Sequence, residues 1–124
     1  HLKYLAAGSY ATELISQYVR EHGFLTLEEA HWRLSALPAF CAGFQDRGVL
    51  REGAAADVVV YDYEKLDYEF PNFRHDLPGD EYRVVSAGSG YRYVVVNGEV
   101  TIEDDKETQT YSGKLLRGGR AATA

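Results

Sequence analysis

The segment Gly48–Asp62 is the feature of this sequence that most constrains the fold. Within it, Val58–Tyr61 is a run of apolar residues without polar alternation, which is typical of a short strand covered on both faces. Four residues are too few for a helix, and Val and Tyr favour a pleated surface. Gly48 and Gly53 fit turns, because glycine tolerates backbone angles that other residues avoid. We therefore expect turns and a buried strand here, with helices before it and strands after it.

The N-terminal part of the chain predicts two amphipathic helices. Apolar residues recur at helical spacing after Ser9, which fits an N-cap, and Gly23 is placed to end this first helix. Thr26 and Glu29 form a T-x-x-E capping box, which predicts the start of a second helix. Pro38 then stops or kinks that helix, or occupies the first turn of a short following one.

The C-terminal part of the chain predicts strands and one long loop. Tyr91–Val96 and Glu99–Glu103 are expected to pair around Asn97–Gly98, the strongest two-residue hairpin signal. Tyr82–Ser86 predicts a further strand. Tyr63–Glu81 has no sustained period, so we expect an unusually long loop there, whose aromatic side chains pack on another surface.

Composition excludes several classes of function. The chain has 124 residues, the length of one ordinary domain, and a net charge of -6, whereas nucleic acids and anionic membranes require a basic face. No apolar run approaches the roughly 20 residues that span a bilayer, and the first residues do not resemble a signal peptide. The single cysteine, Cys41, excludes an internal disulfide framework and is expected to be a small buried hydrophobe. A cytoplasmic location is expected.

Several motifs, in one order, resemble the C-terminal part of an amidohydrolase-superfamily enzyme. Gly48–Asp62 resembles the start of the small β-domain of that family, and Val94–Val100 resembles its strand–Asn-Gly–strand hairpin. Upstream, Leu25–Ala30 and Leu37–Ala39 resemble the last barrel helix and the turn beyond it. Downstream, Ser112–Arg117 resembles the closing tail of the N-acyl-D-amino-acid deacylase branch. The resemblance covers nearly the whole chain.

This resemblance implies an α+β fold in two parts. Residues 1–45 would be the last helices of a (β/α)8 metal-dependent hydrolase barrel, and residues 46–124 the C-terminal portion of a small, composite β-sandwich domain with a hairpin. In the family, both chain ends build that domain. We therefore expect open strand edges and apolar faces that associate with the missing N-terminal part of the parent protein, or with a second copy in a homo-oligomer.

The catalytic groups are expected to lie in that missing part. Amidohydrolases activate water on divalent metals, and the resemblance implies zinc for the parent enzyme. The histidines of this chain lack the His-x-His spacing of such sites, so we assign to it no catalytic residue, no metal ligand and no cofactor. The resemblance places His1 at the end of the S-D-x-x-A-H run of the deacylase-like branch, just after its metal-proximal aspartate. His1 is therefore assigned as a substrate-proximal residue, and His31 to packing.

Three functions remain open from the sequence. The order of the motifs favours the C-terminal fragment of a metal-dependent amidohydrolase that cleaves a non-peptide C–N bond. Its small-molecule acyl amide substrate would be an N-acyl-D-amino acid, and the isolated chain should be inactive. The second is a non-catalytic interaction module that binds a partner. The third is a structural subunit of a split hydrolase whose catalytic chain is encoded separately.

Overall fold

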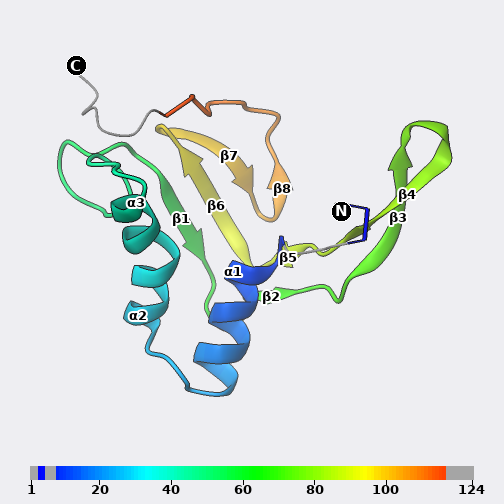
Figure 1. Cartoon of the computed structure of the whole chain (residues 1–124), viewed down its shortest axis with the longest axis horizontal. Coiled ribbons are helices and arrows are strands. Elements are labelled where there is room, and N and C mark those ends of the chain that lie inside the picture. The colour runs from blue at the N-terminus through cyan, green and yellow to red at the C-terminus, as the bar shows by residue number, and fades with distance from the viewer. Residues whose placement is uncertain (1–2, 5–7, 117–124) are drawn as a thin grey trace.

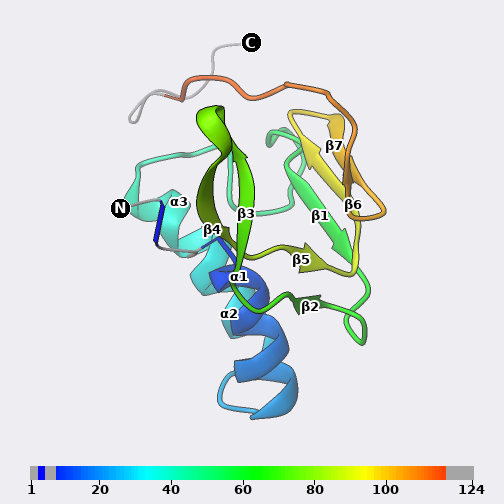
Figure 2. The ribbon, with the colours of Figure 1, turned by 90° about the vertical axis from the view of Figure 1, so that its right-hand side faces the viewer.

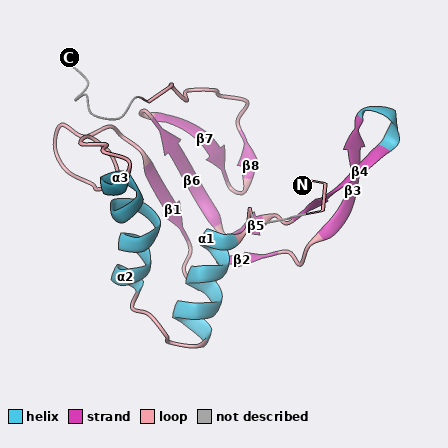
Figure 3. Ribbon diagram, in the orientation of Figure 1, coloured by secondary structure: helices cyan, strands magenta, loops and turns pink. Residues whose placement is uncertain are grey.

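The structure is a computed structural model that describes residues 3–4 and 8–116, and Figure 1 shows its arrangement. Two helical segments come first, and antiparallel strands follow them. The α+β class predicted from the sequence is therefore confirmed. Figure 3 shows both helical segments together on one side of the molecule, beside the four-stranded sheet. None of the helices in the described ranges is long and apolar enough to cross a membrane.

The first helical segment comprises α1 (Tyr10–Glu13) and the wider, π-helical turns of η1 (Leu14–Glu21). Its inner face carries the apolar Ile15 and Val19, which are buried as the apolar pattern predicts. The polar Thr12 and Ser16 are buried with them, whereas Tyr10 and Tyr18 are exposed. Gly23 has a φ of 63° and ends the segment as predicted, in a conformation that other residues rarely adopt. The side chain of Ser9 makes no capping hydrogen bond, so the predicted N-cap contact is wrong.

The second helical segment comprises α2 (Leu27–His31), η2 (Trp32–Ala36) and α3 (Leu37–Cys41). It begins at the predicted capping box, where the Glu29 amide donates to Thr26 Oγ1 at 3.1 Å. Pro38 lies in the first turn of α3, which is the short following helix that the sequence predicts. Cys41 at its end is exposed, so the predicted burial of this side chain is wrong.

The main sheet is antiparallel with the strand order β1-β6-β7-β8. The predicted two-residue hairpin is confirmed, since Asn97 and Gly98 both have positive φ angles, 50° and 85°. This geometry matches the twist of the flanking strands and fixes their register. The strands are β1 (Val58–Tyr61), β6 (Tyr91–Val96), β7 (Glu99–Glu103) and β8 (Lys106–Glu107).

Strand β1 is more exposed than its sequence indicates. Val59 is 52% exposed and Val60 is 44% exposed, so a strand covered on both faces is the wrong expectation for the described residues. The reason is its position: β1 is an edge strand whose pairing partner among these residues is β6 alone. An apolar edge of this kind is a template for pairing with further chain.

The predicted long loop over 63–81 is wrong in part, because it holds the first strand of a hairpin that we call the arm. The strand predicted at Tyr82–Ser86 is confirmed as the second strand of this hairpin. The arm comprises β3 (Asn72–Leu77), the turn η3 (Pro78–Asp80) and β4 (Glu81–Val85). It projects away from the main sheet, as Figures 1 and 2 show. At its base, β2 (Asp67–Tyr68) pairs with β5 (Gly88–Ser89).

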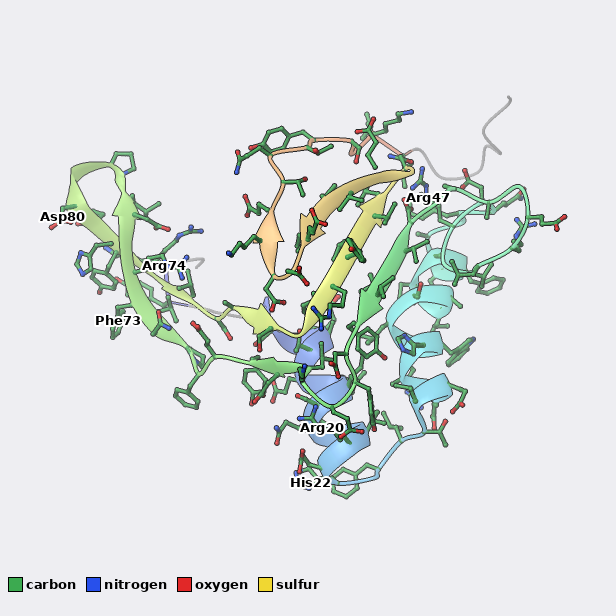
Figure 4. The ribbon with its side chains drawn as sticks, turned by 180° about the vertical axis from the view of Figure 1, so that it is seen from behind. Arg20, His22, Arg47, Phe73, Arg74 and Asp80 are labelled. Carbon is green, nitrogen blue, oxygen red and sulfur yellow. The ribbon has the colours of Figure 1, made fainter. Side chains whose placement is uncertain are left out.

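The buried core lies where the helical segments meet the loop that follows β1. Leu66 in that loop is fully buried, and Arg20 of η1 fixes the loop by donating to the carbonyl oxygens of Tyr63 at 2.8 Å and Leu66 at 2.7 Å. Figure 4 shows Arg20 at this junction. The buried apolar residues are Ile15, Val19, Ala30 and Leu66.

Candidate functional site

A mainly apolar cavity of about 710 Å³ lies between the helical segments and β1. Apolar side chains from α1, η1, η2 and β1 form much of its wall. A cavity of this size and composition accommodates apolar protein segments or apolar ligands. Its lining includes Ala11, Ile15, Leu34, Val49, Val58 and Val59.

One polar pair lies within the wall of this cavity. His31 Nε2 and the Tyr61 hydroxyl are 2.7 Å apart and share a hydrogen bond, and the two rings lie 5.8 Å apart between centroids. Burial raises the pKa of the Tyr61 phenol, and nearby Tyr63 and Tyr91 raise it further. The phenol therefore stays protonated at neutral pH, and His31 has the packing contact that the sequence predicts.

A polar network joins three of the segments that carry the sequence motifs. Asp57 forms an ion pair with Arg47, whose Nη2 also donates to Asn97 Oδ1 at 2.6 Å. The Asn97 amide donates to Asp57 Oδ1 at 2.8 Å, and Asn97 Nδ2 donates to the Ser112 carbonyl oxygen at 2.7 Å. The network joins the start of β1, the β6–β7 turn and the C-terminal tail. We call it the Asp57 network.

A second set of contacts joins Lys3 to the arm. The Lys3 ammonium forms an ion pair with Glu81 and lies 4.5 Å from the centroid of the Tyr82 ring. The Val84 amide donates to the Lys3 carbonyl oxygen at 3.0 Å. The side-chain hydrogen bond between Lys3 and Glu81 raises the pKa of the Lys3 ammonium and lowers the pKa of the Glu81 carboxyl. The arm thus contacts the segment that precedes α1 through main chain and side chain.

The other acidic side chains of the arm also lie beside basic partners. Arg83 donates from Nε and Nη2 to the two oxygens of Asp76, both at 2.7 Å. This bidentate hydrogen bond lowers the pKa of Asp76. His75 Nδ1 donates to the Asp80 carbonyl oxygen at 2.9 Å. Ion pairs and hydrogen bonds of this kind, within one hairpin, are typical of a folded hairpin.

The described residues do not fit the zinc site that the resemblance implies for the parent. No group of three His, Cys, Asp or Glu side chains converges among residues 3–4 and 8–116. The sequence-predicted site residue, His1, lies outside the described residues. Sequence reasoning missed the contacts of Lys3, because no motif links it to Glu81, 78 positions away.

The comparisons with known proteins agree on one family. The family model described as "Amidohydrolase family" matches residues 4–102. The chain is 42% identical over 91 residues to an N-acyl-D-glutamate deacylase, and 28% identical over 107 residues to a D-aminoacylase, both from Alcaligenes xylosoxydans xylosoxydans. Solved structures of D-aminoacylase match with a TM-score of 0.64 and 27% identity, and one of them concerns the binuclear metal center of that enzyme.

These matches cover most of this chain but a small part of each relative. The alignments span 73% and 83% of the chain, yet 17% of the N-acyl-D-glutamate deacylase and 19% of the D-aminoacylase. The structural match spans 86% of the chain and 21% of the solved D-aminoacylase. The chain therefore spans about a fifth of the length of the relatives it matches.

Proposed function

The chain belongs to the amidohydrolase family, and from this we propose that it is the C-terminal part of a deacylase that hydrolyses N-acyl-D-amino acids. The observation that carries the proposal is the joint match, in sequence and in fold, to enzymes whose names specify that substrate class. The Asp57 network supports it, because three of the five segments that carry the resemblance contact one another through Asp57, Asn97 and Ser112. The order of these segments along the chain therefore reflects one folded unit rather than separate chance matches.

In this proposal the chain builds the enzyme rather than performing its chemistry. The segments α1–η1 and α2–η2–α3 are the last helices of the (β/α)8 barrel, within residues 1–45. Residues 46–124 are the C-terminal portion of the composite β-domain. The open edge of β1 and the apolar cavity beside it receive the N-terminal part of the parent protein. A second copy of the chain is the alternative partner.

The reaction is the hydrolysis of the amide bond of a small-molecule substrate. Water adds to the acyl carbon, the C–N bond breaks, and the nitrogen leaves as an amine after taking a proton. The products are a carboxylic acid and a free D-amino acid. In this family, a divalent metal supplies the activated water. We place that metal, zinc according to the resemblance, in the part of the parent that lies outside the described residues.

Substrate stereochemistry tests the proposal most sharply. We expect the full-length protein that contains this chain to hydrolyse N-acetyl-D-glutamate, with N-acetyl-L-glutamate as the matched control. A kcat/KM at least about 100-fold higher for the D enantiomer, about 2.7 kcal/mol, would support a D-selective deacylase. Equal rates for the two enantiomers would contradict it. A requirement for a separately encoded chain would favour the split-hydrolase alternative.

A further inference from the structure

The arm presents a cluster of aromatic rings to solvent. The rings of Phe73 and Tyr82 meet edge to face with centroids 5.2 Å apart, and the ring of His75 lies 5.9 Å from that of Tyr82. Phe73 is nevertheless 69% exposed. An isolated two-stranded hairpin is marginally stable in water, and an exposed phenylalanine adds little to it. The cluster therefore suits contact with an apolar group better than stabilisation of the arm itself.

The two faces of the arm differ in chemistry. Phe73 pairs with Val84 and His75 with Tyr82 in the β3–β4 register, which places the rings on one face. The Arg83–Asp76 ion pair occupies the other face. Figure 4 shows Phe73 and Arg74 on opposite sides of β3. We call these the ring face and the ion-pair face of the arm.

The ring face is turned toward the segment that precedes α1. The Lys3 ammonium lies over the ring of Tyr82, so this face borders residues 3–4. If α1–η1 is a barrel helix, as the proposed function requires, residues 3–4 before it belong to a βα-loop. Such loops form the active-site face of a (β/α)8 barrel. The arm then stands at the rim of the active site with its rings directed to that rim.

On this basis we propose that the arm forms one wall of the substrate entrance, and that the ring face contacts the acyl group of the substrate. This inference rests on the proposed function. An N-acyl-D-amino acid has an apolar acyl end and an anionic end. The ammonium of Lys3 is already paired with Glu81, so the ring face offers no uncompensated positive charge to a carboxylate. Its exposed rings match the apolar end.

The test compares a short and an aromatic acyl group on the same amino acid. In the full-length protein, Phe73→Ala should raise KM for N-phenylacetyl-D-glutamate about tenfold, since losing a ring contact costs on the order of 1.4 kcal/mol. KM for N-acetyl-D-glutamate should change less than about twofold, because an acetyl group is too small to fill the contact. kcat should stay the same for both. The control is Arg74→Ala on the ion-pair face, which should change neither KM.

Two outcomes would overturn the proposal while leaving the proposed function intact. In the first, Phe73→Ala shifts KM equally for both substrates or for neither. In the second, Arg74→Ala reproduces the shift. A thermal unfolding midpoint measured for each variant separates a folding defect from a lost contact. Wild-type protein that hydrolyses neither substrate would contradict the proposed function itself, and the role of the arm with it.

Discussion

The Asp57 network and the arm lie at two ends of the molecule and are held in different ways. The network joins residues 40 positions apart, Asp57 and Asn97, and its Arg47 side chain is only 14% exposed. The arm is held by its own strand pairing and by exposed ion pairs. Exposed ion pairs contribute about 0–1 kcal/mol, whereas hydrogen-bonded charges that are partly removed from water contribute more. The Asp57 network, which we call the frame, therefore fixes the fold, whereas the arm projects from the molecule and is available to a ligand.

The largest expected difference in stability comes from shortening one side chain in the buried core and one in the arm. Leu66→Ala should lower the free energy of unfolding by about 2–5 kcal/mol, because Leu66 is fully buried and its removal leaves a cavity. Phe73→Ala in the arm is the matched change and should cost less than about 1 kcal/mol. Urea denaturation of the full-length protein measures both. Equal losses would show that the arm is part of the core.

A second test removes one carboxylate from each region. Asp57→Ala should cost about 1–3 kcal/mol, because it leaves Arg47 Nη1 and the Asn97 backbone amide without their acceptor. Asp76→Ala removes an exposed partner of Arg83 and should cost less than Asp57→Ala, because solvent screens an exposed ion pair. The same denaturation assay applies. A larger loss for Asp76→Ala would reverse the roles that we assign to the two regions.

The smallest expected effect is the acid response of the arm. The Asp76 pKa in the folded protein lies below its ordinary value. The carboxylate therefore stabilises the fold above the unfolded pKa, and this contribution is lost as the pH falls through the folded pKa. NMR titration should place the Asp76 pKa below that of a free aspartate. Arg83→Gln should return it upward and leave the pKa of Glu81, whose partner is Lys3, unchanged.

The helical segments and the β6–β7 hairpin could be predicted from the sequence, because local rules specify where each of them begins or turns. The capping box at Thr26, the glycine at position 23 and the Asn97–Gly98 turn each act over a few residues. Three of the five motifs that resemble the amidohydrolase family, those containing Asp57, Asn97 and Ser112, are joined by the Asp57 network. Their spacing along the chain reflects these long-range contacts.

Strand β3 and the exposure of β1 could not be predicted, for two physical reasons. The sequence predicts the second strand of the arm, Tyr82–Ser86, which lies at Glu81–Val85, but β3 has no sustained apolar period, because polar side chains such as Asp76 pair with Arg83 instead of facing a core. Burial of Val59 and Val60 depends on which elements lie beside β1, and a strand's own sequence does not show that. In the function that we propose, further chain covers the exposed apolar residues at that edge.

The central claim is that this chain supplies the frame and the entrance of a deacylase, while the groups that activate water lie in the rest of the protein. Hydrolysis of N-acetyl-D-glutamate should be measured for the 124-residue chain alone, for the remainder of the protein alone, and for the two mixed. We predict no activity from either piece and recovered activity from the mixture, because the open edge of β1 and its cavity are completed only there. Hydrolysis by the 124-residue chain alone would contradict the account.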